Sequence, residues 1–182
     1  MATTTSGPAT EAELLAMPDD GHKYELVDGE IRRVSPAGAR HSEVSGELLA
    51  RLREFAKPRR LGRVFDSSAG FRLPSGNVRS PDVSFVAAGR FENDEAPVGF
   101  SPVVPDLAVE VLSPNDAAQE VLDKIGEYLD AGVRLVWVID PQERRANRYR
   151  SIADVRTLAG EDELDGEDVL PGFRCRLAQI FE

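Results

Sequence analysis

The sequence predicts an α/β fold, in which a mixed β-sheet is flanked by helices and preceded by an antiparallel hairpin. The first observation is a strand–helix–strand order over residues 107–139, the pattern of a crossover between parallel strands. The second is an Asp-Gly pair joining two β-prone runs in YELVDGEIRRV, which indicates a hairpin. The third is an amphipathic helix over residues 41–56. A mixed sheet covered by helices accommodates all three.

The elements follow in order along the chain. Residues 1–10 are small and polar, and we expect them to be disordered. Residues 11–182 form one domain, because no linker or repeat divides them and this length suits a single core. A short helix over 11–17 precedes the hairpin. Apolar positions of the 41–56 helix recur on one arc, and Lys57-Pro58 ends it.

The central strands carry the apolar runs. Short strands are predicted over 63–65, 70–73 and 82–86, followed by a loop over 89–105. Residues 107–112 form a nearly continuous apolar run, typical of a strand buried on both faces. A helix over 117–130 ends at Gly132, and VRLVWVID is a second buried strand. The tail from Val169 onward adds a strand and a short helix.

Composition bounds the function classes. The net charge of −10 argues against a broad grip on nucleic acid but allows a compact basic patch. Two candidates are the runs Arg51, Arg53, Lys57, Arg59, Arg60, Arg63 and Arg144, Arg145, Arg148, Arg150, each of which is otherwise a solvated surface. The single cysteine and the lack of a signal-like N-terminus suit a reducing cytoplasm, and no apolar run is long enough to cross a membrane.

Two carboxylates carry the chemistry. Glu110 interrupts an apolar strand, and a buried carboxylate needs a cation, a hydrogen-bond network or a proton. Asp106 lies four residues earlier, about 13 Å along the strand, which is too far to share one ion. Asp82 opens a different strand and can lie beside Glu110, so it is the better second ligand; Asp106 is expected to cap the strand entrance. Paired hard oxygen ligands suit Mg²⁺.

The motifs YELVDGEIRRVSP, RSPDVSFV, PDLAVEVLSPND and KIGEYLDAGVRLVWVIDP, with His41 opening a helix, resemble the PD-(D/E)XK nuclease superfamily. Within it, they resemble most the bacterial Uma-two family of restriction endonuclease-like proteins, over about residues 24 to 141. The resemblance implies a restriction-endonuclease-like core. It also implies an Mg²⁺-dependent nuclease, with Asp82 and Glu110 as catalytic metal ligands.

One position departs from the superfamily pattern. The lysine expected two residues after Glu110 is replaced by Leu112. The closer family offers Lys124, the first residue of its K-x-x-x-Y helix motif, at the edge of that helix's apolar arc. The alternative is that Lys124 has no role in the site and only packs its aliphatic chain along the edge of the apolar helix face, with its amino group in solvent.

Weaker candidates complete the expected site. His41 lies on the inward arc of its helix, as a core histidine or a site residue; Glu25 is either an accessory carboxylate or a plain salt-bridge partner. Tyr128 and Trp137 are expected in the core. The backbone carbonyl of Val111 is a further possible metal ligand.

The first functional hypothesis is a hydrolase that cuts phosphodiester bonds in DNA with Mg²⁺ or Mn²⁺, with Lys124 orienting the attacking water. We expect a homodimer, since cutting two strands takes two sites. The alternative is an inactive nuclease fold that serves as a nucleic-acid-binding or interaction module, which Leu112 and the acidic charge favour.

Overall fold

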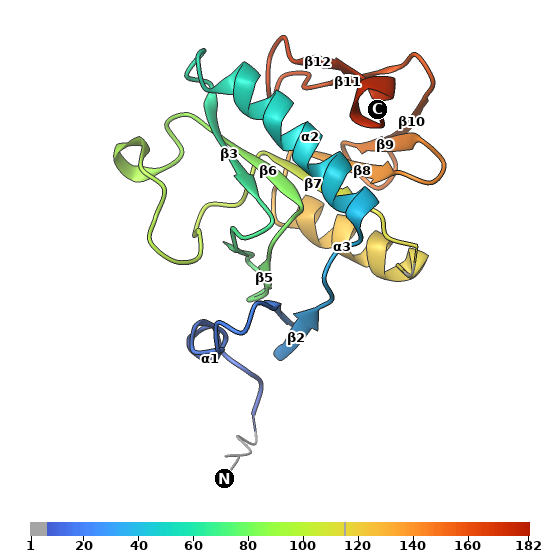
Figure 1. Cartoon of the computed structure of the whole chain (residues 1–182). Helices are drawn as coiled ribbons and strands as arrows, with labels where there is room; N and C mark the ends of the chain where they lie inside the picture. Colours follow the sequence, from blue (N-terminus) through green and yellow to red (C-terminus); the bar gives the residue numbers. More distant parts are fainter. Residues whose placement is uncertain (1–6, 115) are drawn as a thin grey trace.

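The main body of the protein is a six-stranded sheet with one long helix on each face (Figure 1). The computed structural model describes residues 7–114 and 116–182. The strand order is β10-β9-β8-β7-β6-β3. These strands are β3 (Gly62–Asp66), β6 (Val83–Ala87), β7 (Leu107–Val111), β8 (Leu135–Asp140), β9 (Arg145–Tyr149) and β10 (Val155–Ala159). The α/β prediction is confirmed.

The two helices divide the sheet into two cores. α2 (Ala39–Ala56) packs with the odd-numbered residues of β7, such as Val109, and with the C-terminal segment. α3 (Ala118–Asp130) packs on the other face with Ala108 and with Val136. The alternation of strand side chains therefore sends Glu110 to the α3 face, as period two predicts.

The crossover is confirmed. β7 pairs with β8 in parallel, and α3 connects them, whereas the other pairs of the large sheet are antiparallel. Helix boundaries differ slightly from prediction. α2 begins at Ala39, two residues early, and α3 begins at Ala118, one residue late. Helix ends are set by local hydrogen bonds that periodicity does not report.

A second sheet of four strands holds the predicted hairpin. Its order is β2-β1-β5-β4, and β1 pairs with β2 in antiparallel register. Asp28 and Gly29 have φ of 52° and 76°, as a two-residue hairpin turn requires. The strands are β1 (Lys23–Val27), β2 (Glu30–Val34), β4 (Phe71–Arg72) and β5 (Val78–Arg79).

The chain ends complete the fold. Residues 1–10 are predicted to be disordered, and the first six of them lie outside the described residues. Beyond that, the Ala9 amide donates to the Gly29 carbonyl and Thr10 caps α1 (Glu11–Leu15). A 3-10 turn, η1 (Glu92–Asp94), interrupts the long loop. At the C-terminus, the elements are β11 (Glu163–Asp165), β12 (Arg174–Arg176) and the 3-10 turn η2 (Leu177–Ile180).

The register of β6 and β7 positions the predicted carboxylates. Val83 pairs with Val109 at the end of the antiparallel ladder. One step further along the same register, Asp82 stands opposite Glu110. Side chains of directly opposed residues share a face and have Cβ atoms about 5 Å apart. The sheet therefore brings together two residues that are distant in sequence.

Candidate functional site

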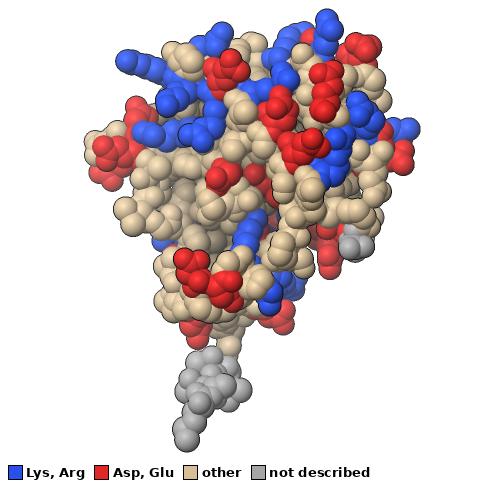
Figure 2. Space-filling view, in the orientation of Figure 1, with Lys and Arg blue, Asp and Glu red and all other residues tan. Residues whose placement is uncertain are grey.

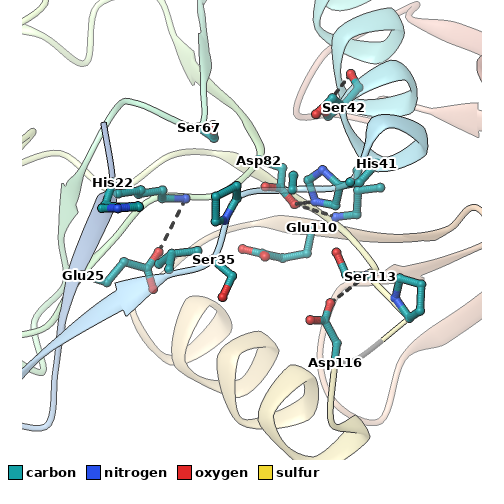
Figure 3. Close-up of a pocket in the computed structure, with 18 of the residues that line it drawn as sticks. His22, Glu25, Ser35, His41, Ser42, Ser67, Asp82, Glu110, Ser113 and Asp116 are labelled. Atoms are coloured by element: carbon teal, nitrogen blue, oxygen red, sulfur yellow. Dashed lines mark hydrogen bonds and ion pairs between the residues drawn. The ribbon is translucent and has the colours of Figure 1, made fainter. Parts of the chain in front are cut away.

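A pocket of about 780 Å³ opens where β6 begins and β7 ends, between the start of α2 and the side of α3. Its walls come from six separate chain segments. The charged and ionisable residues of its lining that matter most are Glu25, His41, Asp82, Glu110, Asp116 and Lys124. Figure 3 shows Asp82, Glu110 and Asp116 around one space, with His41 reaching Asp82 from α2.

Asp82 is held through one of its two oxygens. Oδ2 accepts the backbone N–H of Val111 at 2.8 Å and lies 3.1 Å from His41 Nε2. Among the described residues, Oδ1 has no hydrogen-bond partner, so it remains available to a ligand in the pocket. Burial acts to raise the pKa of Asp82, but the contacts with His41, the Val111 N–H and the charge of Lys23 together lower it below its ordinary value.

Glu110 is held by α3 instead. Lys124 Nζ donates to Oε2 at 2.9 Å, and the Tyr128 hydroxyl donates to Oε1 at 2.7 Å. Lys124 and Tyr128 are four residues apart, so one helix face presents both donors to the strand. Burial raises the pKa of Glu110, Lys124 opposes that rise, and the negative charge of Asp82 adds to it.

The negative charge of the two carboxylates raises the pKa of both Lys124 and His41. Burial acts to lower the pKa of Lys124, but the attraction of Glu110 outweighs it and raises the pKa well above its ordinary value. The hydrogen bond to Asp82 raises the pKa of His41, against the effect of burial. Lys124 is therefore a fixed positive charge at neutral pH, and it points to Glu110 rather than to solvent.

Glu25 borders the pocket but is fully engaged with its surroundings. Its Oε1 accepts the Ser80 N–H at 3.0 Å, and its Oε2 accepts from Arg79 at 3.2 Å. Arg79 also pairs with Glu127 of α3 at 2.7 Å. This network ties the small sheet to α3, so the geometry favours the salt-bridge interpretation of Glu25.

Asp106 lies at the opposite end of the β6–β7 pair. Its Oδ2 accepts the Ala87 N–H at 2.8 Å, and its Oδ1 pairs with Arg90 at 3.0 Å and Arg134 at 3.6 Å. Both oxygens are occupied, and Asp106 is not part of the pocket lining. Leu112, at the usual lysine position, packs with the α3-side core.

The sequence did not predict a site role for two further residues, Tyr128, which contacts Glu110, and Asp116 in the pocket wall. Tyr128 is buried, as expected of a core residue, but its hydroxyl contacts Glu110. Its spacing of four from Lys124 was the available signal. Asp116, between β7 and α3, lines the pocket and accepts the Ser113 N–H at 2.8 Å. Trp137 is fully buried in the core.

The donor set suits a hard cation that keeps much of its water. Within residues 7–114 and 116–182, no group of three or more His, Cys, Asp and Glu side chains is arranged to hold a metal ion. Mg²⁺ commonly uses one or two protein carboxylates, with waters and substrate oxygens completing its shell. Asp82 with a free oxygen and Glu110 opposite it fit that requirement, whereas a structural zinc site does not fit.

No helix in the described part of the chain has the length and apolar character needed to span a bilayer.

The comparisons with known proteins agree with the fold. No curated protein matches the chain significantly. A crystal structure from Anabaena variabilis ATCC 29413, described as "a putative nuclease belonging to DUF820", superposes with a TM-score of 0.84 at 22% sequence identity. The match covers 96% of this chain and 98% of that one. At this identity the likeness establishes the fold. The Uma2 family, described as "Putative restriction endonuclease", matches residues 11–178. This chain belongs to the Uma2 family.

Proposed function

We propose that the protein is an endonuclease that hydrolyses phosphodiester bonds in DNA with Mg²⁺ or Mn²⁺. The observation that carries this proposal is the pairing of Asp82 and Glu110 across two strands of one pocket, with Lys124 bound to Glu110. Buried like charges facing one another favour a divalent cation between them. Membership of a family described as restriction endonucleases supports phosphodiester hydrolysis as the reaction.

In this proposal, Asp82 Oδ1, a Glu110 oxygen and the Val111 carbonyl would hold the ion. The bound ion would polarise the phosphoryl oxygen and lower the pKa of the attacking water. His41 and the Val111 amide position Asp82 by binding its other oxygen. Tyr128 positions Glu110 in the same way. Glu25 is part of the pocket wall, and its bonds to Arg79 and to the Ser80 N–H hold it there.

Lys124 replaces the lysine absent at position 112. Because its pKa is raised, it carries a proton at neutral pH and does not serve as the general base. Its positive charge is suited to orienting a water molecule and to stabilising the extra charge of the transition state. The half-buried side chain is 29% exposed, so it can contact a substrate in the pocket.

Cleavage of supercoiled plasmid DNA tests the proposal. Purified wild type should nick or cut the plasmid with Mg²⁺ or Mn²⁺ and stop when EDTA is added. Asp82→Ala and Glu110→Ala should each lose about three orders of magnitude, and Lys124→Met about two. Asp123→Ala is the matched control, because Asp123 is an exposed acid on the same helix. Equal residual cutting by all variants would show contamination and exclude the enzyme.

The alternative is an inactive module with the same fold. Leu112 in the apolar core is the observation that favours it. The plasmid assay separates the two functions, because DNA binding without metal-dependent cutting by wild type supports the module.

The proposal includes a homodimer in the cytoplasm. Two sites are needed to cut both strands of a duplex. Cys175 is buried and free, and a chain with one cysteine and no internal disulfide suits a reducing compartment. Light scattering of the purified protein tests the dimer, and a monomer mass with and without DNA would contradict it.

A further inference from the structure

The two basic clusters of the sequence have different surroundings in the fold. Arg148 pairs with Glu167 and Asp154, each at 2.8 Å. Arg150 pairs with Glu167 at 2.6 Å and also with Asp168. Arg148 and Arg150 of this second cluster are therefore balanced by acids, whereas Arg144 lies over the Phe181 ring and Arg145 forms no ion pair among the described residues. Only part of the positive charge of this cluster is therefore available to a polyanion.

The first cluster is unbalanced where α2 ends. Arg53, Lys57 and Arg60 are exposed, and within the described ranges none of them forms an ion pair. Arg59 is also exposed and lies over the Phe55 ring, which leaves its charge uncompensated by an acid. Figure 2 shows Lys and Arg side chains gathered over this end of α2, at the upper left. This end of α2 therefore carries a local positive charge on a chain whose net charge is −10.

Two members of the predicted run do not belong to this patch. Arg51 pairs with Glu47 at 2.7 Å. Arg63 on β3 donates to the Asp94 carbonyl at 2.9 Å and, by its register with Val86, points to the face away from α2. The patch therefore contains four of the six residues in the predicted run, Arg53, Lys57, Arg59 and Arg60.

Helical geometry connects the patch to the pocket. At about 100° per residue, Ser42, Gly46, Arg53 and Lys57 fall within about 60° of one another on one side of α2. Ser42 lines the pocket. We call this line of residues, together with Arg59 and Arg60, the basic flank. Arg53 also lies near the pocket-side end of β3, since the pKa of Asp66 is lowered first by its Ser68 hydrogen bond and also by the Arg53 charge.

The acids of α2 lie on a separate side. Glu43, Glu47 and Glu54 fall at about 100 to 140° from Ser42 around the helix. Glu43 pairs with Arg40 at 2.8 Å, and Glu47 with Arg51 at 2.7 Å. None of the acids of α2 therefore lies along the basic flank, although Asp66 of β3 lies near Arg53. An added Cβ at Gly46 would meet nothing within 4 Å.

We propose that the basic flank binds the phosphate backbone of DNA that extends from the pocket along α2. The inference rests on the proposed nuclease function, which places the reacting phosphate at Asp82 and Glu110. From Ser42 to Lys57 the helix rises about 22 Å, which corresponds to about six nucleotides of one duplex strand. Phosphate contacts of this kind position the nucleic acid without reading its sequence.

Binding of a fluorescein-labelled 24-base-pair duplex, measured by anisotropy across salt concentrations, tests the proposal. All variants carry Asp82→Asn, so that cleavage does not interfere. Adding Lys57→Ala and Arg60→Ala should weaken binding at least about tenfold and lower the salt slope by about 1.8. The matched control is Arg145→Ala with Arg156→Ala, which removes the same charge from exposed arginines on β9 and β10 at the far edge of the sheet. Equal losses in both double variants, or none, would overturn the proposal.

Gly46 supplies a second test on the same path. Gly46→Glu should weaken binding by placing a negative charge between Ser42 and Arg53, whereas Gly46→Ala should leave it unchanged. Both replacements fit the open space around Gly46 and favour the helix by up to about 1 kcal/mol, so neither should unfold the protein. Equal binding by the two variants counts against the basic flank.

The outcomes separate this inference from the proposed function. If the basic flank variants lose affinity but wild type never cuts DNA, the binding surface stands and the nuclease proposal fails. If wild type cuts DNA and the basic flank variants bind and cut like their controls, the nuclease stands and the basic flank fails. No measurable binding by any form overturns the basic flank.

Discussion

Asp82 and Asp106 each follow a proline, and they lie at opposite ends of the same pair of strands. Both are largely buried. Asp106 has both oxygens occupied by Arg90, Arg134 and the Ala87 amide. Asp82 has one oxygen bound and one available, and it faces a second carboxylate. Burial therefore does not distinguish the two aspartates. They differ in Oδ1 of Asp82, which has no hydrogen-bond partner among the described residues, and in the Glu110 carboxylate that faces Asp82.

The same contrast holds for energetics. The Asp106 end is held together by opposite charges, so its ion pairs belong to the fold. The Asp82–Glu110 end also brings two like charges together. Burial and the charge of Asp82 raise the pKa of Glu110, although the ion pair with Lys124 opposes the rise. A site of this kind costs folding free energy and is stabilised when a cation binds. Three predictions test this difference.

The largest expected effect is on stability at the Asp106 end. Asp106→Asn should lower the free energy of unfolding by about 2 to 3 kcal/mol, because it leaves Arg90 and Arg134 without their shared partner. Both arginines are partly exposed and can regain water, which limits the loss. Urea unfolding measures the effect. Glu110→Gln should cost much less, and an equal loss in both variants would remove the distinction between the two ends.

The next effect concerns divalent cations. At concentrations ten to a hundred times the dissociation constant, Mg²⁺ or Mn²⁺ should stabilise wild type by about 1.4 to 2.7 kcal/mol. The melting temperature should rise accordingly in wild type and in Asp106→Asn. It should not rise in Asp82→Asn or Glu110→Gln. A metal-dependent rise that persists in these last two variants would place the ion elsewhere.

The smallest effect concerns the support of Glu110. Tyr128→Phe removes one hydrogen bond to a buried carboxylate and should lower stability by about 1 kcal/mol. The metal-induced rise in melting temperature should remain. Tyr149→Phe, on β9 and outside the pocket, is the control for loss of a hydroxyl. A loss of metal stabilisation in Tyr128→Phe alone would show that the hydroxyl shapes the ion site itself.

Much of the fold could be read from local pattern. The Asp-Gly turn, the apolar period of α2 and the crossover from β7 to β8 each depend on residues close in sequence, so short-range physics determines them. Glu110 stood out for the same reason, as a charge inside an apolar run. Strand spacing was sufficient to exclude Asp106 as a partner of Glu110.

The tertiary structure decided which oxygens are free and which cations are balanced. Those properties depend on partners distant in sequence, such as His41 for Asp82 and Arg79 for Glu25. The two arginine-rich runs look alike in sequence, yet Glu167 and Asp168 balance Arg148 and Arg150 of the second, whereas Lys57 and Arg60 of the first meet no acid among the described residues. The sequence by itself determined where the charges lie along the chain. Which of them meet an opposite charge depended on long-range packing, because only the folded chain brings these side chains within a few ångströms.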